Sequence, residues 1–193
     1  MKRLCLKIFI SILCVCLTGC IPLIIAAVGA TAGGAIIYDK RSSKVILQDQ
    51  EITNKALGIL NSDLQLKGVA RVSISTFDHI VLMVGQVKSE YLRQRAYDDV
   101  SQVPSIRRIY NQVQISSVLT ALDQSKDAWI TSKVKSAMLA KSGLRSSQIK
   151  VVTEDKVVYL MGLVTPNQAK LATEVARNVS GVEKVVQVFE YET

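Results

Sequence analysis

The stretch DHIVLMVGQV, residues 78–87, returns as DKVVYLMGLV at residues 155–164. Each version opens with a polar pair and continues as an apolar run that contains one glycine. An apolar run of this length is typical of a buried strand, and a polar pair before it is typical of a hairpin turn. The sequence therefore repeats itself around a central strand, with a spacing of about 77 residues.

The repeat extends in both directions from this strand. Ile52-Thr53-Asn54-Lys55 matches Ile130-Thr131-Ser132-Lys133 upstream, and Val103 and Ile106 match Val179 and Val182 downstream. Residue spacing predicts the same elements in both copies: a helix (49–61; 127–141), a strand (71–76; 150–153), the central strand (80–87; 157–164), a second helix (92–103; 169–179) and a last strand (106–115; 182–191). Asp127 is expected to cap the first helix of the second copy.

The order α-β-β-α-β in each copy predicts an α+β fold. A three-stranded sheet can bury one face under its two helices. Units of about 65 residues have small cores, so the two units are expected to lean on each other.

The N-terminus has the parts of a secretory signal in order. Basic residues precede an apolar run at 8–17, and Leu17-Thr18-Gly19-Cys20 matches the bacterial lipobox. In such a site Cys20 is acylated on its sulfur, with a fatty acid such as palmitate, and becomes the first residue of the mature protein. Two alternatives stay open: a plain signal in which Cys20 is one more small residue, or an uncleaved anchor over residues 8–37.

Removing residues 1–19 changes the composition. Three cysteines and three basic residues leave with the leader, so the formal charge falls from +8 to about +5 and no disulfide can form. The remaining basicity favours an anionic partner, and export makes nucleic acid the least expected one. The expected organisation is a signal peptide (1–19), an acylated apolar tether (20–46), a first repeat (47–115), a polar linker (116–125) and a second repeat (126–193).

No catalytic or metal-binding set can be assembled from the sequence. His79 is the only histidine, and it falls in an expected turn beside Asp78, where a solvated side chain is the ordinary outcome. Gly85 and Gly162 are single glycines that indicate a bulge or a close approach of the backbone, not a phosphate-binding loop. We expect no enzymatic activity, no metal and no cofactor.

One helix, 127–141, has a surface that is not explained by packing alone. Ile130, Val134, Ala137 and Met138 share its core side, while Trp129 and Leu139 point elsewhere, among small residues. Lys133 and Lys135 flank this patch. The pattern suits an apolar wedge with cationic edges that enters an anionic lipid surface. Packing of Trp129 on the neighbouring repeat, or on the start of its own helix, suits the pattern equally well.

Three motifs give the chain a family resemblance. Gly-x-Val after a strand, an Ala-rich helix and then Ser180-Gly181-Val182-x-x-Val185 resemble the BON domain, and residues 38–42, 129–134 and 160–165 resemble outer-membrane lipoproteins with two such domains. The resemblance implies two tandem BON domains, each with two helices packed on a three-stranded mixed sheet. The first copy departs from the pattern at Val103-Pro104-Ser105-Ile106, so its last loop is expected to differ in shape.

The same resemblance implies a function. In these lipoproteins the corresponding helix binds anionic phospholipid through a tryptophan and a leucine, which match Trp129 and Leu139. The lipid-binding residues expected from this match and from the helix pattern are Trp129, Ser132, Lys133, Ser136, Leu139 and Ala140. Cys20 would then hold the protein to the outer membrane, facing the periplasm, in support of envelope integrity. The alternative is an interaction scaffold that docks another envelope protein without recognising lipid.

Overall fold

A computed structural model describes residues 41–192 of the chain. They fold as α2 (Ser43–Ser62), β1 (Arg71–Phe77), β2 (Ile80–Val87), α3 (Glu90–Ser101), β3 (Arg108–Ile115), α4 (Ala121–Ala140), the short 3₁₀ helix η1 (Ser146–Gln148), β4 (Ile149–Glu154), β5 (Val157–Val164), α5 (Pro166–Arg177) and β6 (Lys184–Tyr191). Each half has the order α-β-β-α-β, with η1 added in the second half. The predicted α+β fold is confirmed.

The two sheets have the same topology. Their strand orders are β1-β2-β3 and β4-β5-β6. In each sheet the first pair is antiparallel and the second pair is parallel, because a helix connects the second strand to the third. Both sheets are therefore mixed, as expected, and the central strand is the one that the repeated stretch forms.

The first helix of each half begins earlier than the sequence pattern indicated. Ser42 caps α2 by accepting a hydrogen bond from the backbone N–H of Val45, so the helix starts inside the segment expected to be tether. Helix α4 starts at Ala121, so residues 121–125 are helical although they were expected to lie in the linker.

The hairpin turns are held by an aspartate from the first helix. Asp78 and His79 both have positive φ, of 49° and 63°, as a type I′ turn requires. Their backbone N–H groups donate to the buried carboxylate of Asp49 at 2.7 Å each. In the second half Asp127 accepts from Asp155 and Lys156 in the same way, at 2.8 and 2.9 Å. The expected turns are confirmed, and each is tied to its helix.

Gly85 and Gly162 mark a close approach of two backbones. A Cβ at Gly85 would lie 1.9 Å from the carbonyl oxygen of Arg71, and one at Gly162 would lie 2.5 Å from that of Gln148. No side chain fits at such distances, so the glycine of the repeated stretch is a steric requirement of strand pairing.

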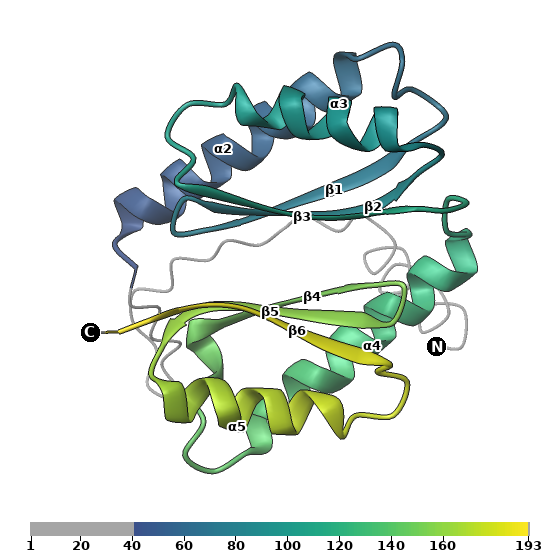
Figure 1. Cartoon of the computed structure of the whole chain (residues 1–193). Helices are drawn as coiled ribbons and strands as arrows, with labels where there is room; N and C mark the ends of the chain where they lie inside the picture. The colour runs from purple at the N-terminus through teal and green to yellow at the C-terminus, as the bar shows by residue number, and fades with distance from the viewer. Residues whose placement is uncertain (1–40, 193) are drawn as a thin grey trace, which may run out of the picture. The chain divides into compact units, whose positions relative to one another are not determined.

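The two sheets pack face to face, with the helices on their outer faces (Figure 1). The faces that meet form one apolar cluster of Phe77, Ile80, Leu82, Val84, Tyr159, Met161 and Val188. Both faces of β2 are consequently covered, and every residue of this strand is buried. The expectation that the units lean on each other is confirmed.

Polar contacts tie the two halves at the margins of this cluster. Arg71 of β1 pairs with Glu154 of β4 at 2.5 Å, and the same carboxylate accepts from the buried amide of Gln86 at 2.7 Å. The ammonium of Lys150 donates to the carbonyl oxygen of Thr76 at 3.1 Å. These contacts satisfy polar groups that the packing of the sheets removes from water.

The last loop of the first half keeps the backbone conformation of the second. Ser105 has a φ of 71°, where the matching Gly181 has a φ of 99°. The expectation of a different loop shape is wrong at this residue, because Ser105 takes the left-handed conformation that glycine adopts without strain.

Candidate functional site

Helix α4 carries the residues expected to recognise a surface, apart from Cys20. It begins after Thr120, whose hydroxyl accepts from the backbone N–H of Asp123 at 3.2 Å and donates to the Asp123 carboxylate at 2.6 Å. The Thr120 hydroxyl thus satisfies one of the backbone N–H groups that the start of the helix leaves without a partner. The expectation that Asp127 caps the helix is wrong, because Asp127 lies within the second helical turn and binds the hairpin turn.

One face of α4 belongs to the core of the second domain. Ile130, Val134 and Met138 are buried and form part of one apolar cluster with residues of β4, β5 and α5. Ala137 is half-buried on the same side. The predicted core stripe of this helix is confirmed, and it fixes which residues face outward.

The opposite face of α4 is open to solvent. Trp129 is 65% exposed and Leu139 is 72% exposed, although both are large apolar side chains. Ser132, Ser136 and Ala140 are also exposed and lie between or beside them. Trp129 therefore packs neither in the core nor between the two sheets.

Trp129 and Leu139 form an exposed apolar stripe on α4, and this stripe is longer than the sequence indicated. Leu122 is 66% exposed and precedes Trp129 by seven residues, so it lies almost directly in line with it on the helix. It was missed because residues 116–125 were interpreted as linker. The spacing of Thr120 and Asp123 could have revealed the true helix start, since a threonine followed three positions later by an acidic residue is a recognised start signal.

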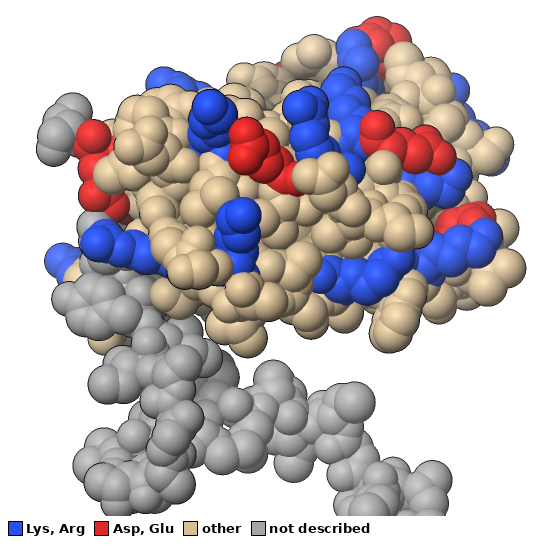
Figure 2. All heavy atoms as spheres, turned by 90° about the horizontal axis from the view of Figure 1, so that it is seen from below, with Lys and Arg blue, Asp and Glu red and all other residues tan. Residues whose placement is uncertain are grey.

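Basic side chains border this stripe, and two of them also bind other groups of the protein. Lys133 is half-buried, and its ammonium donates to the carbonyl oxygen of Ser180. Lys135 and Lys126 are exposed, and Lys126 pairs with Asp123 at 2.9 Å. Hydrogen bonds from Thr120 and then from Lys126 lower the pKa of the Asp123 carboxyl. Seen from the α4 and α5 side, basic and acidic side chains are scattered over a largely uncharged surface (Figure 2).

Other candidate residues have different outcomes. Cys20, the leader and the apolar segment 21–37 lie outside the described residues. His79 is less solvated than expected: its side chain is 18% exposed, with Nδ1 lying 3.7 Å from the Asp78 carboxylate. Across residues 41–192, no three His, Cys, Asp or Glu side chains gather as metal ligands would. Nor does any helix in that range combine the length and apolarity of a membrane span.

Comparison with known proteins identifies the class. The BON domain matches residues 48–117 and again 126–193, so both halves are matched and together they include most of the chain. The chain belongs to the BON-domain family and carries two such domains.

Three individual proteins show which BON-domain proteins this chain is similar to. The outer membrane lipoprotein DolP of Haemophilus influenzae is 30% identical over 175 residues, which cover 91% of this chain and 90% of that protein. A 21 kDa hemolysin of Actinobacillus pleuropneumoniae is 34% identical over 153 residues, or 79% of each chain. Osmotically-inducible protein Y of Escherichia coli is 43% identical over 60 residues, 31% of this chain and 30% of that one.

These relatives define what kind of protein this is. It is a dual-BON protein similar to DolP, and it is an outer-membrane lipoprotein that faces the periplasm. None of the three relatives is named as an enzyme.

Proposed function

We propose that the protein binds anionic phospholipid bilayers through the exposed face of α4 and thereby supports the integrity of the envelope. The observation that carries this proposal is the exposure of Trp129 and Leu139 on a helix whose other face is fully used by the core. Tryptophan favours the boundary between water and lipid, because its ring is apolar while its N–H keeps a polar partner. Lys135 and Lys126 lie where anionic headgroups would meet the edges of the stripe.

The first domain supplies a natural contrast. Glu51 occupies the position in α2 that Trp129 occupies in α4, and it is exposed and paired with Lys55 at 2.6 Å. A carboxylate at this place is repelled by anionic lipid, so the first domain contributes no matching contact. The exposed face of α4 is therefore the proposed lipid-binding site. The corresponding face of α2 serves as an internal control for lipid binding.

The proposed membrane contact can be tested by placing a charged residue in the exposed apolar stripe. Trp129→Glu should weaken binding to phosphatidylglycerol vesicles by about 2–3 kcal/mol, because it removes apolar burial and adds a like charge. Leu122→Ser should weaken it by about 1 kcal/mol, because a smaller apolar area is lost. Neither should change the free energy of unfolding by more than about 0.5 kcal/mol, since both sites are exposed. Flotation and thermal unfolding of residues 37–193 measure the two effects.

Asn54→Glu is the matched control for this test, since it adds the same charge to an exposed position of α2. It should float as the wild-type protein does. Equal loss in Asn54→Glu and Trp129→Glu would show that net charge alone governs binding. A Trp129→Glu protein that melts several degrees lower and still floats would refute the lipid contact. A wild-type protein that folds but never floats would leave the protein-docking scaffold as the function.

The anchor is tested separately. We propose that Cys20 carries the lipid, because it ends the lipobox and no other cysteine follows it. Cys20→Ser removes the sulfur that acylation needs, so the precursor should stay unprocessed or leave the outer-membrane fraction. Gel mobility and membrane fractionation report both effects, and unchanged fractionation would contradict the anchor at this residue.

A further inference from the structure

A groove lies beside the exposed end of α4. It runs between the C-terminal half of this helix and the start of β4, and η1 closes one end. Met138, Ile149 and Val151 form its buried apolar floor, Leu139 forms the rim, and Lys135 and Ser146 supply polar groups. Its volume of about 370 Å³ falls within the range of sites that hold small ligands.

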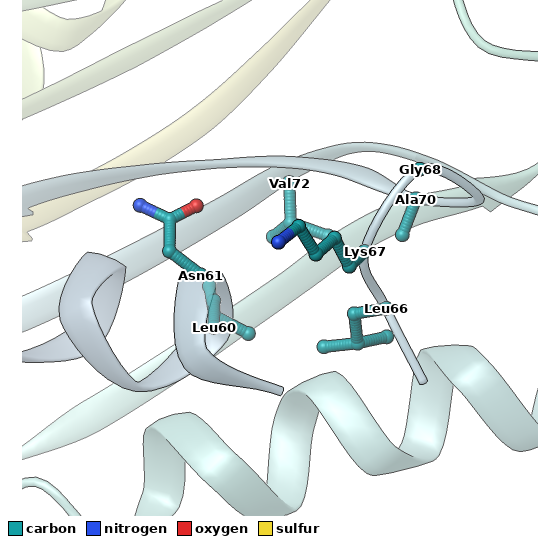
Figure 3. Close-up of a pocket in the computed structure, with 7 residues that line it drawn as sticks. All are labelled: Leu60, Asn61, Leu66, Lys67, Gly68, Ala70 and Val72. Carbon is teal, nitrogen blue, oxygen red and sulfur yellow. The ribbon is translucent and has the colours of Figure 1, made fainter. Parts of the chain in front are cut away.

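The first domain has a matching groove that differs in one informative way. Figure 3 shows it between the end of α2 and the start of β1, with Leu60, Leu66 and Val72 on its walls. Its volume, about 360 Å³, is nearly the same. Asn61 stands where the second groove has Leu139, so the helix contributes a polar side chain to the rim of the first groove and an apolar one to the rim of the second.

One basic side chain, Lys135, lines the second groove. Lys150, the next residue after Ile149 on β4, points away from the groove and donates to Thr76. Burial lowers the pKa of Lys150 and repulsion by Arg41 lowers it further, while Asp49 raises it and Lys135 adds a smaller lowering. Lys135 itself is exposed, and among residues 41–192 it forms no ion pair with a carboxylate. An anionic ligand in the groove would therefore meet a lysine that no carboxylate of these residues neutralises.

We propose that this groove holds a single anionic phospholipid, with an acyl chain on Met138, Ile149 and Val151 and the phosphate beside Lys135 and Ser146. The inference rests on the proposed membrane contact, because Leu139 belongs both to the stripe on α4 and to the rim of the groove. A lipid can therefore pass from the bilayer into the groove without its chain crossing water. The groove would thus bind a single lipid molecule, in addition to the contact of α4 with a bilayer surface.

A lipid that is monomeric in water separates these two modes of binding. Dihexanoyl-phosphatidylglycerol below its micelle concentration offers no bilayer for Trp129 to enter. With residues 37–193, which include all three apolar clusters, it should bind at one site and shift the amide NMR signals of residues 146–151. Lys135→Gln should weaken this binding about 10-fold, the loss of one charge-assisted contact. Ser146→Trp should abolish it by filling the groove.

Controls assign the result to the groove. Lys67→Gln, the same change at the first groove, should leave binding unchanged. Loss of monomer binding in Trp129→Glu would place the lipid on the open helix face and overturn the groove. So would the absence of any saturable binding by a wild-type protein that floats on vesicles, an outcome that leaves the membrane contact intact. Monomer binding without flotation would support the groove and reject the bilayer contact.

Discussion

Single residues in this protein are exposed or buried because of the element that carries them. Trp129 lies outside the core because another side of α4, which carries Ile130 and Val134, packs into the core. Tyr159 is the reverse case: its position on β5 faces the other sheet, so a phenol that could reach water from a loop is buried between the two domains. The chemistry of each ring follows from this placement.

The Tyr159 phenol should make stability depend on pH above about 10. Burial, followed by the charges of Glu154 and Asp155, raises its pKa to about 12 from the model-peptide value of 10.0. Between these values the unfolded chain loses the proton while the folded chain keeps it, so stability must fall as the pH rises. Denaturant unfolding at pH 9, 10 and 11 should show a steeper fall for the wild-type protein than for Tyr159→Phe. Parallel curves would mean that Tyr159 titrates as in water.

The helices, strands and turns differ in how clearly the sequence predicts them. The central strands, their turns and the core stripe of α4 were predictable, because a repeated pattern of apolar residues records burial directly. The start of α4 was missed because the apolar spacing begins two turns later, and the pair Thr120 and Asp123 is the signal that marks it. The contact of Lys133 with the backbone carbonyl of Ser180, 47 residues away, was not predictable, because no pattern of side chains records such a contact.

The paired loops at Ser105 and Gly181 allow a test at the level of elements. Ser105→Gly should raise the free energy of unfolding by up to about 1 kcal/mol, because the left-handed conformation strains a residue with a Cβ. Gly181→Ser should lower it by more, because the new Cβ would also lie 3.2 Å from Ile130. Denaturant midpoints measure both changes. A loss of stability in Ser105→Gly would show that the serine side chain stabilises this loop.

At the scale of the whole molecule, the two domains are halves of one structure. Each domain has a core between its helices and its sheet, and a third core joins the sheets. The sequence predicted contact between the units but not its form, because a strand buried on both faces looks the same whatever covers the second face. A single domain would expose Phe77, Ile80, Leu82 and Val84 to water.

Residues 37–193 should therefore unfold in one transition. Met83 is fully buried on the helix side of β2, within the core of the first domain. Met83→Ala should destabilise the protein by about 2–5 kcal/mol. If the domains are coupled, amide hydrogen exchange at the buried residues 158–161 of the second domain should accelerate by the matching factor. Exchange that stays at the wild-type rate there would show that the domains unfold independently.

The joined sheets also decide how the protein responds to dilution. A single-domain protein with the same apolar sheet face would need a second copy to cover it, and its folded fraction would depend on how many copies the cell holds. Here the covering domain is part of the same chain, so mass action plays no role in closing that face. The fold is complete in a single molecule, and its melting temperature should be the same at any protein concentration.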